Sequence, residues 1–262
     1  MTHPNIIKII CHDIGKHLGC YGVKSVSTKA IDALAKNGIL FENSYATSPG
    51  CSPSRAAIAT GLYPHNNGVL GLAHAHFGWS LDKKVNHIAK HFFKNNYSSI
   101  LFGLQHVTYN EKTLGFKKIF PERPADAVVK NIRENIDSNL FKKPFYAEIN
   151  FFEPHRPFDF GGVKPFKSKG ISVPKYIPNN HDIRKEFASM QGAIKKMDDS
   201  VGKIINILKR TNLYENTIIL FTTDHGIPFP RAKGTLYDLS LIHISEPTRP
   251  ERIADAVFCL KK

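Results

Sequence analysis

The sequence predicts an α/β protein in which a mostly parallel sheet carries helices on both faces. Two observations support this fold class. Short apolar runs rich in β-branched residues alternate along the chain with longer amphipathic segments, an order that is typical of parallel sheets. Hydrophobic residues make up 42% of the 262 residues, which is enough for a substantial core and argues against disorder.

The predicted strands are four apolar runs: residues 5–11, 98–103, 145–152 and 217–224. Residues 27–38 are a predicted helix, capped by Ser27 or Thr28 and closed by Gly38. A longer helix is predicted between the last two strands, because apolar residues recur at three- and four-residue spacing over residues 183–208. Strands that alternate with helices in this way indicate a parallel sheet whose ligands gather at the carboxyl ends of the strands.

Residues 51–61 (CSPSRAAIATG) predict a short helix with a cysteine at its mouth. Ser52 is the expected N-cap, Pro53 suits the first turn, and Gly61 is expected to end the helix. Cys51 would then lie just ahead of the helix N-terminus, where free N–H groups favour an anion. On the Cys-x-Pro pattern alone, a small buried structural cysteine is an equally good interpretation.

The complete stretch, Cys51-Ser-Pro-Ser-Arg55 followed by Thr60-Gly61, resembles the signature of the type I sulfatases. The resemblance implies an alkaline phosphatase-like fold and oxidation of Cys51 to formylglycine by a formylglycine-generating enzyme. One hydroxyl of the hydrated aldehyde would attack sulfur and the other would expel sulfate, which divides one difficult step into two. Arg55 is expected to orient this nucleophile. Ala59 stands where the family usually has leucine.

Metal-ligand residue types follow the first and last predicted strands, in His12-Asp13 and Asp224-His225. They resemble the sulfatase metal pattern, except that His12 stands where the family has a second carboxylate. The resemblance implies one divalent cation, Ca²⁺, bound by these four residues. The two imidazoles would suit Mn²⁺ or another transition metal better, and both alternatives stay open.

Three further residues have expected roles through the same resemblance. His155 in FFEPHRPF matches a histidine that contacts the sulfate or the leaving oxygen, and His106 in FGLQHV matches a second site histidine. Lys233 in RAKGTLYD matches a lysine that binds sulfate oxygens. Leu104 stands where the family has another lysine, so one cation of the anion clamp is missing. Residues 153–182 carry five prolines and little periodicity, and are expected to form a long functional loop.

Within the family, the chain resembles the heparan N-sulfatases (sulfamidases) and their bacterial relatives from about residue 4 to residue 238. This implies hydrolysis of a sulfate ester or sulfamate on a sulfated small molecule or a glycosaminoglycan-type sugar. Two alternatives stay open. One is a phosphodiesterase or phosphonate hydrolase of the same superfamily, since phosphate and sulfate esters share their geometry. The other is an inactive basic binding protein on this fold, since Leu104 removes a sulfate ligand.

The formal net charge of +14 fits a polyanionic partner. Nucleic acid is not expected, because the lysines are spread along the chain rather than clustered with aromatic residues. No apolar run reaches the roughly 18 residues of a membrane span, and none is expected. The four cysteines form no disulfide framework or zinc pattern. No signal peptide is visible, so the expected location is cytoplasmic as written, or periplasmic or secreted if the start is misassigned.

Residues 239–262 (LSLIHISEPTRPERIADAVFCLKK) do not continue the sulfatase pattern, which breaks directly after Asp238. The segment resembles a translated sequencing adapter, and a divergent C-terminal helix is the alternative. We therefore expect residues 1–238 to be an incomplete, C-terminally truncated catalytic domain and residues 239–262 to be a foreign tail.

Overall fold

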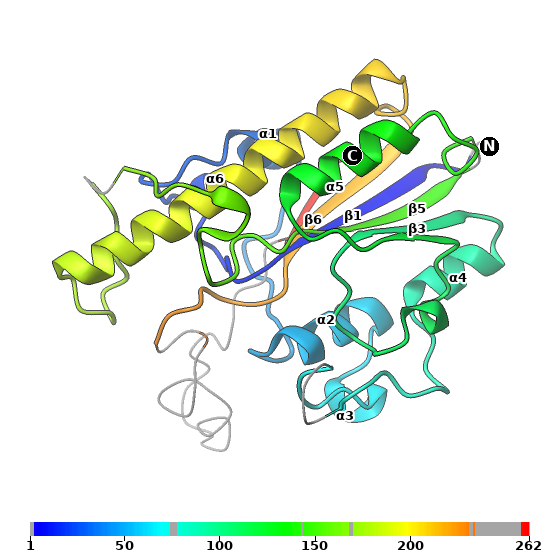
Figure 1. Ribbon diagram of the computed structural model, residues 1–262, viewed down its shortest axis with the longest axis horizontal. Coiled ribbons are helices and arrows are strands. Elements are labelled where there is room, and N and C mark those ends of the chain that lie inside the picture. The colour runs from blue at the N-terminus through cyan, green and yellow to red at the C-terminus, as the bar shows by residue number, and fades with distance from the viewer. Residues whose placement is uncertain are drawn as a thin grey trace.

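The computed structural model describes residues 3–73, 78–142, 144–167, 170–230 and 233, and the backbone of residues 258–261. Within these residues, seven strands form one sheet in the order β2-β7-β6-β1-β5-β3-β4 (Figure 1). The strands are β1 (Asn5–Cys11), β2 (Gly38–Leu40), β3 (Ser98–Gly103), β4 (Lys118–Phe120), β5 (Phe145–Asn150), β6 (Thr217–Thr223) and β7 (Phe258–Lys261). The run from β6 to β4 is parallel, while β7 is antiparallel to both β6 and β2. The prediction of a mostly parallel sheet is confirmed.

The four predicted strands are present as β1, β3, β5 and β6. All six residues of β3 and all six of β5 are buried, which explains why these strands are apolar runs rather than alternating patterns. β5 ends at Asn150 and β6 at Thr223, slightly earlier than predicted. The polar residues beyond these ends leave the sheet and lie at its carboxyl edge.

Helices cover both faces of the sheet, with α1, α5 and α6 on one side and α2, α3 and α4 on the other (Figure 1). Their bounds are α1 (Lys29–Asn37), α2 (Cys51–Thr60), α3 (Pro64–Asn67), α4 (Ile88–Lys94), α5 (Ala125–Asn135) and α6 (His181–Arg210). The main apolar core lies under the first set, where Ile9 of β1 packs in one cluster with Ile31, Val128 and Ile194 of α1, α5 and α6. The spacing that predicted the long helix is the buried stripe of α6.

Helix caps differ from the sequence prediction. Gly50, not Ser52, is the N-cap of α2, so Cys51 is the first residue of the helix. The Ser52 hydroxyl lies inside the fold, where it accepts a hydrogen bond from Ala73 N at 3.0 Å. Gly61 ends the helix as predicted, at φ 71°, with its N–H donating to the carbonyl of Ala57.

Thr28 occupies the N-cap position of α1, as one of the two predicted candidates. The cap comes from another element, because the Asp198 carboxylate of α6 accepts hydrogen bonds from Ala30 N at 3.1 Å and Ile31 N at 2.9 Å. The Thr28 hydroxyl instead accepts from Gly19 N at 2.8 Å. A tertiary contact therefore replaces the local cap that the sequence predicted.

Two of the longer elements were not predicted, α4 and α5. Helix α5 buries Ala125, Val128, Val129 and Ile132, a spacing that could have been recognised from the sequence. Residues 153–180 of the predicted loop 153–182 are irregular where they are described, apart from a 3₁₀ turn at Phe160–Gly162, and the last two residues already belong to α6. The loop prediction is confirmed for the backbone of those residues.

The segment predicted to be a foreign tail, residues 239–262, lies outside the described residues except for β7. The backbone of β7 inserts between β6 and β2, pairing Leu220 with Leu260 and Gly38 with Lys261. In the described part of the chain, no helix is both long and apolar enough to cross a bilayer.

Candidate active site and metal centre

The site begins where β1 and β6 end side by side. Cys11 pairs with Thr223 in the parallel register, so the residues that follow each strand emerge together. Asp13 N donates a hydrogen bond to Asp224 Oδ1 at 3.0 Å, and His12 Nδ1 lies 2.9 Å from Asp224 Oδ2. His12, Asp13 and Asp224 are all at most 1% exposed. The two predicted metal pairs are therefore brought together at one buried point.

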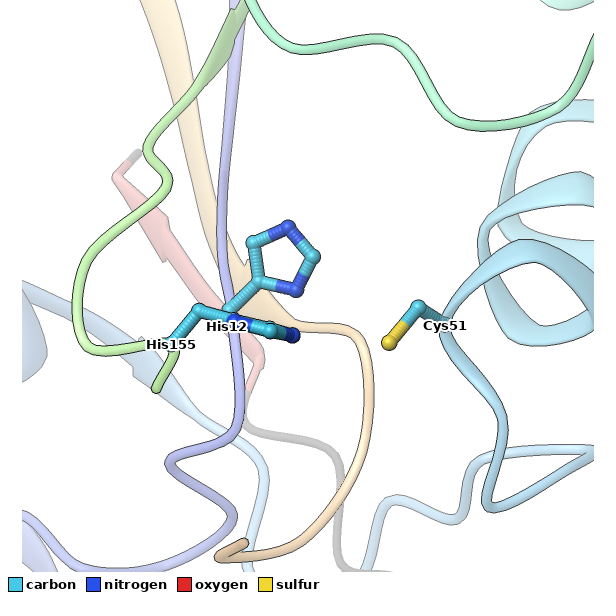
Figure 2. Close-up of side chains that lie close together, drawn as sticks. All are labelled: His12, Cys51 and His155. Atoms are coloured by element: carbon cyan, nitrogen blue, oxygen red, sulfur yellow. The ribbon is translucent and has the colours of Figure 1, made fainter. Parts of the chain in front are cut away.

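Helix α2 is fixed against this point by its first turn. Ser54 Oγ donates to the carbonyl oxygen of Asp224, and Arg55 Nε donates to Asp224 Oδ2 at 3.0 Å. As a result, Cys51 faces the strand ends, with its sulfur 3.2 Å from His225 Nε2. Figure 2 shows the Cys51 sulfur pointing from the helix toward the rings of His12 and His155.

Histidines from four strand ends surround the Cys51 sulfur. His12 follows β1, His106 follows β3, His155 follows β5 and His225 follows β6. The His12 ring lies edge-on to His155 with centroids 5.1 Å apart, and to His106 with centroids 6.2 Å apart. Carboxyl ends of parallel strands share one edge of a sheet, which is why residues so distant in sequence meet here.

The surroundings of Cys51 favour its thiolate. Burial alone would raise its pKa, but the neighbouring imidazoles of His106, His12, His155 and His225 hold that pKa well below the usual 9.0. Cys11, which is also buried, shows the opposite, because burial and the nearby Asp224 charge raise the pKa of its thiol. Cys51 is thus the cysteine placed to carry negative charge.

The carboxylates and cations of the site hold one another ionised. Burial opposes the charge of Asp224, yet His225, His12 and Arg55 keep its pKa well below 3.8. Burial likewise opposes protonation of His225, but the carboxylates of Asp224 and Asp13 raise its pKa to about 9. The site is therefore a compact set of alternating charges.

Lys233 lies within the same set. Its Nζ is 2.6 Å from Asp13 Oδ1 and 3.2 Å from Cys51 Sγ. Burial would lower its pKa, but the charge of Asp13 raises it above 10.5, so the side chain is cationic. Lys233, the lysine expected to bind sulfate oxygens, therefore lies beside Cys51 and is paired with the carboxylate of Asp13.

Two predicted residues have contacts that the sequence did not indicate. Arg55, expected to orient the nucleophile, contacts Asp224 rather than Cys51. Its buried Nη2 has no hydrogen-bond partner among the described residues. Leu104 is half-buried beyond β3, where its N–H donates to the carbonyl of Asn150 at 3.3 Å and its side chain supplies no charge. Ser54 is the site residue to which the sequence reasoning gave no role, although it lies inside the cysteine motif.

The donor set fits a divalent cation. Ligand atoms of His12, Asp13, Cys51 and Asp224 all lie within 4.8 Å of one another, and all four residues are buried. Among the described residues, His12 Nε2 and Asp13 Oδ2 have no hydrogen-bond partner, which is costly unless something else binds them. His225, the fourth predicted ligand, lies beside this set with Nε2 at 3.3 Å from Asp13 Oδ1. Buried carboxylates and an imidazole that converge in this way are typical of metal sites.

Comparison with known proteins identifies relatives of this chain. A sequence model of the Sulfatase family matches residues 4–243. Human N-sulphoglucosamine sulphohydrolase is 24% identical over 95% of this chain and 56% of its own length. An ulvan-active sulfatase of Formosa agariphila is 30% identical over 91% of this chain and 47% of its own length. This chain thus spans about half the length of these curated relatives.

Solved structures share the fold. A phosphonate monoester hydrolase of Agrobacterium radiobacter superposes with a TM-score of 0.71 over 99% of this chain and 68% of its own, at 18% identity. At that identity the likeness concerns the fold alone. The family match, in contrast, covers most of the chain and includes all the site residues described above. The chain belongs to the sulfatase family.

Proposed function

We propose that this chain carries the active site of a formylglycine-dependent sulfohydrolase that acts on a sulfate ester or sulfamate of an anionic sugar. The observation that carries the proposal is the position of Cys51, with its sulfur 3.2 Å from both His225 Nε2 and Lys233 Nζ and beside the buried Asp13 and Asp224. The names of its relatives, a sulphoglucosamine sulphohydrolase and an ulvan-active sulfatase, support a sulfated sugar as substrate.

Residue 51 is the proposed nucleophile. Converted to formylglycine by a modifying enzyme, it would supply a hydroxyl at the position that the thiol now occupies. His225 Nε2 faces that position and, with a pKa of about 9, holds a proton there at neutral pH. Arg55 acts through Asp224, which it fixes against the first turn of the helix.

The proposed sulfate position lies beside residue 51, within reach of Lys233. Lys233 would bind a sulfate oxygen there, because its Nζ already contacts the sulfur of Cys51. His155 is half-buried beside residue 51, where it is suited to give a proton to the leaving oxygen or nitrogen. His106 is the more neutral partner, because burial lowers its pKa. Without a lysine at position 104, Lys233 and these histidines carry anion binding.

A divalent cation is proposed at His12, Asp13, Asp224 and residue 51, with His225 beside them. Bound there, the ion would neutralise charge on the sulfate and on the oxygen of residue 51. The carboxylates suit Ca²⁺, and the imidazole of His12 suits Mn²⁺ or another transition metal.

The test is co-expression of the full chain with a formylglycine-generating enzyme, followed by mass spectrometry of the peptide that contains Cys51. We expect conversion of Cys51, while the peptides of Cys11 and Cys20 stay unmodified. The converted protein should release sulfate from an aryl sulfate or from N-sulfoglucosamine, and Cys51→Ala should abolish this release. Cys20→Ser, away from the strand ends, is the matched control and should keep it.

Three outcomes would contradict the proposal. Sulfate release by Cys51→Ala would mean that another residue attacks. Hydrolysis of phosphonate or phosphate diesters in preference to sulfated substrates would favour the phosphonate hydrolase alternative. A converted protein that binds sulfated sugars without hydrolysing them would favour the binding-protein alternative.

A further inference from the structure

The unconverted cysteine gives this chain a second chemical state, with a thiol where the proposed nucleophile would stand. We propose that in this state the chain binds Zn²⁺ through the Cys51 sulfur and one ring nitrogen each of His12 and His155. Ligand atoms of these three side chains lie within 4.8 Å of one another. This is a nitrogen and sulfur set, different from the carboxylate-containing set at the same strand ends.

The imidazole of His155 is oriented as zinc ligands usually are. Its Nδ1 contacts the carbonyl oxygen of Arg156, which leaves Nε2 available. In zinc sites the second ring nitrogen of a ligand histidine is commonly held by such an oxygen acceptor. Figure 2 shows the rings of His12 and His155 beside the Cys51 sulfur, and the His12 nitrogen on that side is Nδ1.

Burial and polar atoms without hydrogen-bond partners also indicate a binding site. His12 is 1% exposed and Cys51 is 4% exposed. Neither ring nitrogen of His12 has a hydrogen-bond partner in the described part of the chain, and a metal bond would compensate one of them. His155 is half-buried, so one ligand of the set is partly exposed to solvent.

The nitrogen and sulfur set is favoured over the carboxylates for a soft ion. Asp13 Oδ1 is engaged by Lys233 at 2.6 Å, and Asp224 Oδ2 by Arg55 at 3.0 Å. Thiolate and imidazole select Zn²⁺, whereas Ca²⁺ requires oxygen ligands. Binding would release to solvent the proton that the Cys51 thiolate shares with its neighbouring imidazoles, and three protein ligands would leave one coordination position open.

This inference does not rest on the proposed hydrolysis, because it concerns the unconverted chain and is measured by metal binding alone. The full chain is produced without a formylglycine-generating enzyme, and mass spectrometry verifies that Cys51 is intact. The protein is stripped of metal, and Zn²⁺ is titrated against a chromophoric chelator. Co²⁺ is then used as the spectroscopic probe.

We expect one high-affinity Zn²⁺ per chain, and a thiolate-to-cobalt charge-transfer band with Co²⁺. Cys51→Ser should remove that band, and Cys51→Ser, His12→Gln and His155→Ala should each weaken Zn²⁺ binding by at least about tenfold. The matched control is His181→Ala, which removes a surface histidine whose side chain is 91% exposed, and it should change nothing.

Asp13→Asn separates the two ligand sets. In the proposed site this change should weaken Zn²⁺ binding less than His155→Ala does. Binding that depends on Asp13 and is unaffected at His155 would overturn the proposal. So would wild-type protein that gives no charge-transfer band with Co²⁺, whether or not the converted protein hydrolyses a sulfated substrate.

Discussion

Two clusters of buried charge lie on the same sheet, and they are built differently. One is the candidate active site at the strand ends. The other, which we name the Lys8–Glu148 network, lies in the middle of β1 and β5 and consists of Lys8, Tyr146, Glu148, Asn150 and His87. Lys8 and Glu148 are partners in the parallel register, with Nζ 2.9 Å from Oε2.

In the Lys8–Glu148 network the carboxylate is surrounded by donors. Tyr146 OH donates to Glu148 Oε2 at 2.7 Å, and Asn150 Nδ2 donates to Glu148 Oε1 at 3.1 Å. Burial opposes ionisation of Glu148, but the charges of Lys8 and His87 lower its pKa to about 2. Both clusters contain buried polar atoms without hydrogen-bond partners among the described residues: His12 Nε2 and Asp13 Oδ2 at the strand ends, and Lys8 Nζ and Asn150 Oδ1 in the network. The difference is convergence, because among the described residues only the strand ends bring three or more His, Cys or carboxylate ligand atoms within 4.8 Å of one another. Buried charge alone thus does not identify a site, whereas convergent ligand atoms do.

The largest expected effect separates the two clusters by metal content. Asp224→Asn removes a charge from the proposed ligand set, so the purified protein should lose its divalent ion and its sulfate release. Glu148→Gln is the matched carboxylate-to-amide change in the network and should keep the ion. Elemental analysis of both proteins measures the difference. Undiminished metal in Asp224→Asn would refute the assignment of Asp224 as a ligand.

Glu148→Gln in the network should have a larger effect on the free energy of unfolding than an exposed carboxylate-to-amide change. Glu148→Gln leaves the buried Lys8 ammonium without its counter-charge, and we expect the free energy of unfolding to fall by about 3–5 kcal/mol. Denaturant titration monitored by circular dichroism measures this change. Asp199→Asn breaks the exposed pair of Asp199 with Lys195 on α6 and should cost less than about 0.5 kcal/mol. Equal costs for the two substitutions would mean that the network does not stabilise the sheet.

The network should also set part of the acid sensitivity. Burial, assisted by the charge of Lys8, lowers the pKa of His87 to about 4, although Glu148 opposes this. The folded state therefore excludes a proton that the unfolded chain accepts below pH 6.5, so the free energy of unfolding should fall by about 3 kcal/mol between pH 6.5 and pH 4.

The variant His87→Asn isolates this contribution. Asparagine can replace the cap that His87 Nδ1 provides to Ala89 N at 3.1 Å, so α4 should be retained. His17, whose pKa burial also lowers to about 4, is present in both proteins and does not affect their difference. In the variant, the free energy of unfolding should fall less steeply between pH 6.5 and pH 4, as measured by denaturant titration at several pH values. An unchanged slope would show that His87 is not the titrating group.

The smallest expected effect is the change in the free energy of unfolding caused by Cys51→Ala in the candidate active site. Cys51→Ala should change the free energy of unfolding by less than about 1 kcal/mol in metal-free protein, because the thiol fills little space and its charged neighbours keep their carboxylate partners. Thermal unfolding measures this change. A loss as large as that of Glu148→Gln would instead give Cys51 a structural role, and would erase the contrast between the two clusters.

The sequence alone was enough to predict the parallel strands and the long helix. Continuous apolar runs and three- to four-residue periodicity reflect burial of β3, β5 and α6, which is a local property of each segment. The same holds for the site residue types, since His12, Asp13 and Asp224 follow strands that could be recognised. The end of α2 at Gly61 was also predictable, because a left-handed φ of 71° favours glycine at that position.

Only the tertiary structure decided which of these residues contact one another. Arg55 lies 169 residues before Asp224, and Lys233 lies 220 residues after Asp13, yet each pair is in hydrogen-bond contact. The pairing of Lys8 with Glu148 likewise requires β1 and β5 to be neighbours in register. Local pattern fixes the type of each element and the face that it buries. Strand order and register fix which polar side chains meet in the interior, because a buried charge is stable only beside a partner that the whole fold brings to it.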